Sequence, residues 1–422
     1  MTPRSPASYP FRRPGSAAAR AATARLAAPL LLASLLALAA TPPVARVVAE
    51  PELAVTSRGH APSVALDGRK RGVVTWVSGA SGQATAIHAR RFEGNAFRGA
   101  DFRVNTLAAG DLREPAVAMD ARGGFLVAWQ EASAPGADSA IRGRLFRANG
   151  SPRGACCGDL TLNPPGASSA HPRVAMAPDG RFAVGWEHSP ADVGLTVRLA
   201  TFRADGLPLG RPVPMNGAGV TANLVGAVSA GPASVALGWT EVSPCPQMPI
   251  DPVSAVATFS WDLRPLGDVD RLANNNPCVD GPMVLALPGS DLGPLGIFVG
   301  RRYSIQRFSP LDGQRVGPRT NVAELPFCGG GDCERVVAVA GDPRGRFVFV
   351  WERVRHLAQG DPFDLFAELY GREGLRRLDR FPINNIASGA PEHPAAALGA
   401  DGALVVVWER AGGLVMRKLQ VP

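Results

Sequence analysis

The sequence has little lysine, tyrosine, histidine and cysteine, and these shortages narrow what the chain can do. Only two of its 44 basic residues are lysines, Lys70 and Lys418, and it has 3 tyrosines, 6 histidines and 6 cysteines. Beyond the first 40 residues the tyrosines are Tyr303 and Tyr370. A catalytic mechanism that needs a tyrosine nucleophile therefore has two candidates.

Several signatures of catalysis and ligand binding are also absent. The sequence has no GxSxG motif, no phosphate-binding GxxxxGK[ST] loop, no EF-hand loop and no HExxH motif. The usual sequence evidence for an α/β-hydrolase, a nucleotide-binding fold, a calcium site or a zinc protease is therefore missing, and the sequence predicts no cofactor.

The positive charge is smaller than it first looks. The formal net charge is +8, but residues 1–40 hold five arginines and no acid, so the remainder carries +3. These charges are spread along the chain, whereas nucleic-acid binding proteins concentrate theirs on one face. The sequence therefore predicts no nucleic-acid partner.

The N-terminal segment has the features of a secretory signal. A basic stretch leads into the apolar run LAAPLLLASLLALAA at 26–40, and Ala37-Leu38-Ala39 fits a cleavage site. Fifteen residues are short for a membrane span, which needs about 20. We therefore expect a signal peptide at 1–40, a short linker at 41–51 and a periplasmic or extracellular protein without a membrane span; the alternative is an uncleaved anchor.

Cysteine usage agrees with export. Cys328 and Cys333 bracket the short loop FCGGGDC, and Cys245 and Cys278 lie in two loops expected on one face. Both pairs are predicted disulfides. The adjacent Cys156 and Cys157 are left open between a vicinal disulfide, a soft metal site and two free thiols.

A repeated motif sets the architecture. In six of seven copies a turn is followed by an apolar run that ends in tryptophan, and in the fifth copy the anchor is phenylalanine. The anchors are Trp76, Trp129, Trp186, Trp239, Phe298, Trp351 and Trp408, separated by 53, 57, 53, 59, 53 and 57 residues. Units of this length built from strands are typical of a β-propeller. The sequence predicts an all-β fold with seven four-stranded antiparallel blades.

The second copy shows the expected blade. Strands are predicted at 115–120, 125–130, 141–146 and 159–163. The second of these is apolar on successive residues, as expected for a strand covered on both faces. Small residues in the first strands suit the crowded axis of a propeller.

Closure follows from a count of strands. Fourth strands are recognisable in only six units, because the last unit ends after its third strand. The segment ELAVTS at 52–57 precedes the first unit and has no partner there. We therefore predict that this N-terminal strand completes the seventh blade, at 394–419, and closes a propeller that spans 52–419.

The pattern resembles the Asp-Gly…Trp β-propeller repeats of exported bacterial proteins, with the approximate consensus P-x-V-A-x-D-x-x-G-x-F-V-V-x-W. The resemblance covers residues 52–419. It implies the fold and export, but it implies no activity, because propellers serve as binding modules, hydrolases and lyases alike.

Histidines and carboxylates gather on one face, which we call the top. It is formed by the loops that lead into first strands and by those that join second to third strands. The histidines are His60, His171, His188, His356 and His393, and the carboxylates that follow the anchors are Glu131, Glu187, Glu241, Glu352 and Glu409. They predict a polar ring, in which His171, Glu187 and His188 form the best local group. Alternatively, the glutamates pair with arginines and the histidines cap turns.

Two other readings of this face remain open. The Asp-Gly turns resemble the sialidase Asp-box, and Tyr303, beside Arg301 and Arg302 with Glu241 on the neighbouring blade, is a partial match to sialidase chemistry. A glycan-active hydrolase is therefore one alternative, and a metal site on the His/Glu ring is another.

The sequence favours non-catalytic recognition of a protein or a glycan by a monomer. Connections between second and third strands are long in blades two, four and six but short in five and seven, so the top rim is expected to be uneven. No catalytic residue and no metal ligand is assigned. The candidate ligand-binding residues are His171, Glu187, His188, Glu241, Tyr303, Glu352, His393 and Glu409.

Overall fold

The computed structural model describes most of the chain from residue 46 onward. The described ranges are 46–79, 85–106, 110–153, 158–190, 194–215, 222–242, 253–273, 285–286, 294–299, 302–324, 332–355, 364–385 and 391–422. The predicted signal peptide lies outside them. So do Cys156, Cys157, Cys245, Cys278 and Cys328, while Cys333 is described by its backbone alone. The disulfide and export hypotheses therefore stay predictions.

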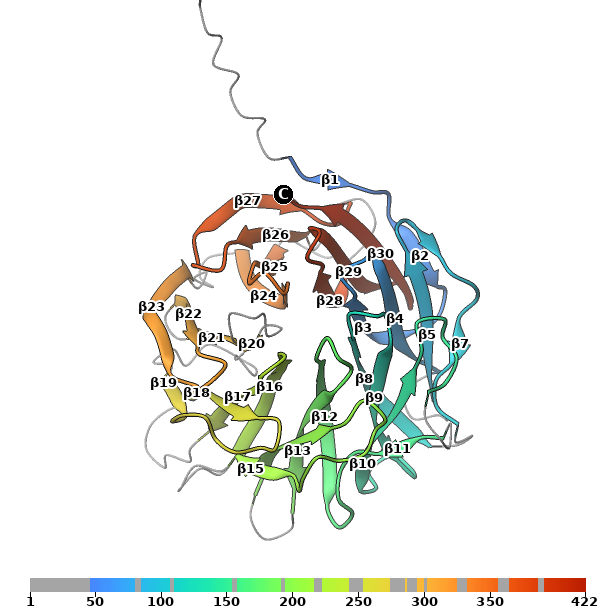
Figure 1. Ribbon diagram of the computed structural model, residues 1–422. Coiled ribbons are helices and arrows are strands. Elements are labelled where there is room, and N and C mark those ends of the chain that lie inside the picture. The colour runs from blue at the N-terminus through green and yellow to red at the C-terminus, as the bar shows by residue number, and fades with distance from the viewer. Residues whose placement is uncertain are drawn as a thin grey trace, which may run out of the picture. The chain divides into compact units, whose positions relative to one another are not determined.

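The strands pair into seven antiparallel sheets (Figure 1). Blade one holds β3 (His60–Leu66), β4 (Arg71–Ser78), β5 (Ala86–Glu93), β6 (Ala96–Phe97) and β7 (Phe102–Arg103). Blade two holds β8 (Asp111–Met119), β9 (Phe125–Ala132), β10 (Ser139–Phe146) and β11 (Leu160–Thr161). Blade three holds β12 (Ser168–Met176), β13 (Phe182–Ser189), β14 (Thr196–Phe202) and β15 (Val213–Met215).

The remaining blades continue the same order. Blade four holds β16 (Ala222–Ala230), β17 (Ser234–Val242), β18 (Val253–Ser260) and β19 (Asp270–Ala273). Blade five holds β20 (Leu285–Ala286), β21 (Leu295–Val299), β22 (Arg302–Phe308) and β23 (Arg315–Glu324). Blade six holds β24 (Asp332–Gly341), β25 (Phe347–Arg355), β26 (Asp364–Tyr370) and β27 (Arg376–Pro382). Blade seven holds β28 (Glu392–Leu398), β29 (Ala403–Arg410), β30 (Gly413–Gln420), β1 (Val48–Ala49) and β2 (Leu53–Thr56).

The first strand of each blade faces the centre of the ring (Figure 1). Neighbouring first strands are in contact, as for β3 with β8 and β28 with β3. Each runs from the top face to the opposite face, which we call the bottom. This confirms the predicted seven-bladed propeller of four-stranded antiparallel blades.

The core lies between the blades. The second strands are buried along their length: Val73, Val127 and Val184 have no exposed surface, and neither do Trp129 and Trp186. The phenylalanines that end the third strands fill the same gaps, and the predicted set Phe92, Phe146, Phe202 and Phe308 is at most 4% exposed. The continuous apolar runs follow from this double burial.

Buried aspartates hold the bottom turns of three blades. In blade six, Oδ1 of Asp342 accepts backbone N–H groups from Arg344 and Arg346 at 3.0 and 2.8 Å, and its Oδ2 accepts the Arg346 Nε–H at 2.7 Å. Asp67 and Asp120 accept equivalent backbone bonds. Gly345 follows at φ 82°, a conformation that favours glycine. The Asp and Gly of the repeat are therefore turn residues.

The N-terminal strand closes the ring as predicted. Strand β2 pairs antiparallel with β30, with Leu53 opposite Met416 and Ala54 opposite Val415. Val55 is 3% exposed in the core between blades seven and one. Glu52 adds an ion pair to Arg410 at 2.7 Å. The first and last of the described strands thus belong to one sheet.

Strand β1 is a detail that the sequence prediction lacked. It lies in the segment 41–51 expected to be a linker, where Val48 pairs with Gln420 and Ala49 with Leu419. This addition leaves the predicted topology unchanged.

Candidate functional site

The top ends of the first strands carry a repeated β-bulge. The pairing register shifts in blades one, two, three, four, six and seven. In four of them the residue before a proline has a positive φ: Ala61, Glu114, His171 and His393, between 46° and 53°. A bulge interrupts the ladder and re-aims side chains, so these positions form the inner rim of the top face.

Glutamates directly after the anchor tryptophan join each bulge to the next blade. Oε1 of Glu187 in blade three accepts the Val225 N–H of blade four at 3.1 Å. Oε1 of Glu409 in blade seven accepts the Ala61 N–H of blade one at 2.8 Å. Both therefore have a structural role between blades, with backbone N–H groups as partners in place of the arginines that the alternative interpretation predicted.

In each of these two blades, a histidine of the first strand binds the glutamate that follows the anchor tryptophan. Nδ1 of His171 lies 2.8 Å from Oε2 of Glu187, and Nδ1 of His393 lies 3.0 Å from Oε1 of Glu409. Each histidine precedes its glutamate by sixteen residues in a His-Pro…Trp-Glu motif. The top face therefore carries two copies of one His–Glu pair, in blades three and seven.

His171 lies between two carboxylates. Its Nε2 is 3.2 Å from Oε1 of Glu114 in blade two, opposite the bond to Glu187. Hydrogen bonds to Glu114 and Glu187 raise the pKa of His171 to about 10. Burial opposes the ionisation of Glu114, but its bond to His171 and the histidine's charge lower the pKa of this carboxyl overall. His171 is thus an imidazolium cation at neutral pH that ties blade two to blade three.

The structure does not bring His188 into this group. Its ring is buried, and Nδ1 lies 3.2 Å from the Ser169 hydroxyl. Burial, followed by the charge of Arg198, lowers the pKa of His188. The predicted trio therefore separates into an ion-paired His171–Glu187 and a neutral histidine in the blade interior.

Glu241 faces away from the channel. It accepts two hydrogen bonds from Arg271, both 2.9 Å, and one from the Trp239 indole at 3.1 Å. Glu131 makes the same kind of bonds to Trp129 and Arg142 at 3.3 Å. Successive side chains of a strand point to opposite faces of the sheet. Glu131 and Glu241, two positions after the anchor, therefore point to the other face from a glutamate one position after it, and they bind arginines of the third and fourth strands.

Tyr303 and Glu352 are both buried. Tyr303 is 4% exposed and packs edge-on against Trp351 at 5.6 Å between ring centroids, in the core of blades five and six. Burial raises the pKa of Tyr303 to about 12. Glu352 is 5% exposed. Arg301 lies outside the described residues, as does the side chain of Arg302.

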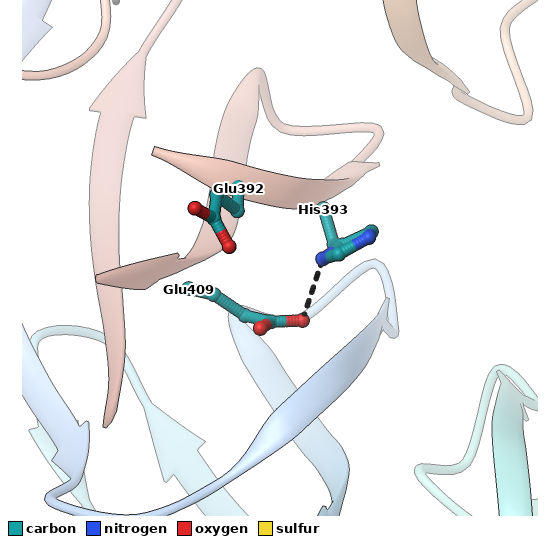
Figure 2. A group of neighbouring side chains, drawn as sticks. All are labelled: Glu392, His393 and Glu409. Atoms are coloured by element: carbon teal, nitrogen blue, oxygen red, sulfur yellow. Dashed lines mark ion pairs between the residues drawn. The ribbon is translucent and has the colours of Figure 1, made fainter. Parts of the chain in front are cut away.

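The open polar group of this face lies in blade seven (Figure 2). Glu392, His393 and Glu409 each offer one ligand atom, and these atoms lie within 4.8 Å of one another. Figure 2 shows the Glu392 carboxylate and the His393 ring both facing Glu409. An imidazole nitrogen and two carboxylate oxygens are ligand types that divalent transition metals accept. In the part of the chain that the structure describes, this is the arrangement suited to hold a metal ion.

Glu114 and Glu392 are not among the residues predicted from the sequence. Glu114 occupies the bulge position that His171 and His393 occupy in their blades, and Glu392 directly precedes His393-Pro394. The repeated X-Pro at the start of the first strands was the available signal. The X-Pro pattern alone does not show that these side chains lie together on the rim, because that depends on the β-bulge, which no residue pattern specified.

The described part of the rim is uneven, with short connections in blades five and seven as predicted. Strands β29 and β30 are joined by Ala411 and Gly412 alone, and β21 and β22 are also two residues apart. The connection of blade two was expected to be long, but its six residues match the six of blade three and fall short of the seven of blade one. The loops of blades four and six lie outside the described residues. A top cavity of about 230 Å³ between blades one and two is lined by His60, Arg113 and Glu114 among others.

Comparison with known proteins supports the fold. No family model and no curated protein matches the chain. Among solved structures, it is similar to an α-L-arabinanase from Penicillium chrysogenum complexed with arabinobiose, with 11% identity, 89% of this chain and 98% of that chain covered, and a TM-score of 0.50. It is also similar to an ulvan lyase of a new polysaccharide lyase family, with 8% identity, 87% and 95% coverage and a TM-score of 0.50. At such identities the likeness concerns the fold alone.

Within the described ranges, no helix has the length and hydrophobicity that a membrane span requires.

Proposed function

We propose that this chain is an exported recognition propeller that binds a protein or an extracellular glycan through its top face without converting it. The proposal rests on one observation: the residues that a catalytic mechanism would need already have hydrogen-bond partners or are buried. Glu187 and Glu241 each accept several hydrogen bonds, and Tyr303 lies in the hydrophobic core. A general acid or nucleophile needs an accessible position beside its substrate.

The exposed polar groups of the top face suit a binding role. Arg113, His171 and His393 keep 48%, 44% and 72% of their side-chain surface exposed. They stand on bulges of rigid inner strands, and rigid scaffolds with varied rims are where recognition commonly resides. The cavity of about 230 Å³ beside Arg113 is small compared with the roughly 300–1,000 Å³ of typical small-molecule sites.

Larger cavities lie on the bottom face, so the test must distinguish the two faces. One of about 530 Å³ between blades one and two is lined by Arg71, Arg91 and Arg98 among others. Another of about 420 Å³ lies at the bottom mouth of the central channel. Arg113 and Arg98 are exposed to similar degrees, 48% and 56%, and offer a matched pair of variants.

The experiment measures the melting temperature of the purified protein with arabino-oligosaccharides, ulvan oligosaccharides and peptidoglycan fragments. A ligand at 100 times its dissociation constant adds about 2.7 kcal/mol of stability, which such a scan resolves. We expect Arg113→Gln to reduce the shift and Arg98→Gln to leave it unchanged. The opposite pattern would move the binding site to the bottom face, and a shift lost in neither variant would contradict both placements.

A glycan-active hydrolase is the competing assignment. The same incubations, analysed for new reducing ends and for unsaturated products, separate binding from turnover. Product formation by the wild type would overturn the proposal of a non-catalytic role. The absence of a shift with every sugar would leave protein recognition, which a screen against purified envelope proteins then tests.

A further inference from the structure

We propose that Glu392, His393 and Glu409 bind one divalent transition-metal ion at the top mouth of the channel. Each residue supplies one ligand, and the open positions of the metal face solvent. The site is separate from the predicted trio of blade three and does not depend on the proposed recognition function.

The spacing of the three side chains fits a metal. With metal–ligand distances of about 2.1 Å, ligand atoms around a tetrahedral or octahedral ion lie about 3.0–3.4 Å apart. Nδ1 of His393 is already 3.0 Å from Oε1 of Glu409, and all three ligand atoms lie within 4.8 Å of one another. Closure by at most about 1.8 Å completes the site, within reach of a change in the exposed Glu392 side chain.

Glu409 is held in place by a bond from outside the group. Its Oε1 accepts the Ala61 N–H of the neighbouring blade at 2.8 Å, and its side chain is 13% exposed. Such outer bonds fix the orientation of metal ligands. The least mobile ligand is therefore positioned before a metal arrives.

The site is also open to solvent. His393 is 72% exposed, and the connection above it is the two-residue turn Ala411–Gly412. Two carboxylates beside one histidine leave a net negative charge, which a divalent cation with a neutral imidazole neutralises. A metal with three protein ligands keeps positions for water or for a group of a bound molecule.

Blade three supplies an internal comparison. It has the same His–Glu pair, His171 and Glu187, but Ala170 stands where blade seven has Glu392. Glu114 also occupies the second nitrogen of His171 at 3.2 Å. The blade-three pair therefore lacks a third ligand and has both ring nitrogens engaged, so of these two pairs the one in blade seven should bind a metal.

The test is a titration of the chelator-treated protein with Zn²⁺ by calorimetry and with Co²⁺ by visible absorption. We expect one ion per chain and Co²⁺ bands of nitrogen and oxygen ligation, without the intense near-ultraviolet charge-transfer band of thiolates. His393→Ala should weaken Zn²⁺ binding at least about tenfold. The isosteric Glu392→Gln variant, at an exposed position, should do the same without affecting folding, and His171→Ala should retain wild-type binding.

Three results would overturn the proposal. The wild type could bind no stoichiometric Zn²⁺ or Co²⁺. Glu392→Gln and His393→Ala could bind as tightly as the wild type, which would locate the metal elsewhere, for example on cysteines. His171→Ala could abolish binding, which would place the metal in blade three. Circular dichroism of each variant verifies that the propeller is folded.

Discussion

At the scale of single residues, the repeat motif encodes two kinds of hydrogen-bond acceptor at opposite ends of the blade. Aspartates such as Asp342 hold bottom turns within one blade, whereas Glu187 and Glu409 bridge top bulges between blades. Asp342 and Glu187 are buried, and removal of any of these carboxylates leaves donors without a partner. A buried unsatisfied group is more costly than the bond itself is worth.

Asp342→Ala should therefore destabilise the fold by about 2–4 kcal/mol, because Asp342 is fully buried and binds two backbone N–H groups and Arg346. The control is Asp179→Ala in blade three, whose side chain is 51% exposed and which should cost less than about 1 kcal/mol. Urea unfolding of both variants measures the difference. Equal losses would contradict a specific role for the buried aspartate.

His171 gives a prediction on pH. Its bonds to Glu114 and Glu187 raise the folded-state pKa to about 10, above the ordinary value of 6.5. Its contribution to stability is therefore complete below pH 6.5 and is lost as the pH rises through 10. The difference in free energy of unfolding between the wild type and His171→Gln should therefore become smaller as the pH rises from 7 to 10.5. NMR of the histidine ring should show His171 still protonated at pH 8.5; a neutral ring there would contradict the ion-paired geometry.

At the scale of the element, the closing strand makes the first and last segments of the chain one unit. Strand β2 supplies the outer partner of β30, and Val55 places a buried side chain between blades seven and one. A propeller without this strand would expose the edge of β30 and open the ring. Closure is thus a tertiary contact between residues more than 350 positions apart.

Val55→Ala should cost about 2 kcal/mol, because it removes buried methyl groups from a packed interface. Val48→Ala in β1 is the control, since Val48 is 55% exposed and should change stability by less than about 0.5 kcal/mol. Chemical denaturation followed by tryptophan fluorescence compares them. The closure described above fails if Val55→Ala is as stable as the wild type.

The repeat predicted these elements well because each depends on local pattern. Apolar runs ending in tryptophan mark strands that two neighbours cover, and the missing fourth strand of blade seven identified β2 by elimination. Strand β1 escaped prediction because two residues carry too little pattern. The site was less predictable, since the pairing of His171 with Glu114 and the burial of Tyr303 depend on contacts between blades.

At the scale of the whole molecule, the two faces differ in how their charges are used. Bottom turns hold aspartates that pair with arginines of the same blade, as Asp67 does with Arg71, and arginines such as Arg346 that also donate to backbone carbonyls of the next blade. The top face carries charges that join neighbouring blades, together with the partly exposed Arg113, His171 and His393. Because neighbouring first strands are in contact, the groups on their bulges are held in place, which suits the proposed recognition.

The most direct test of top-face recognition without turnover follows a single ligand through binding and product analysis. A sugar that raises the melting temperature of the wild type would be incubated with the protein overnight and examined by mass spectrometry. We predict that it is recovered unchanged and that Arg113→Gln, but not Arg98→Gln, lowers the thermal shift. Cleaved or unsaturated sugar, formed by the wild type and absent from a protein-free control, would contradict the account.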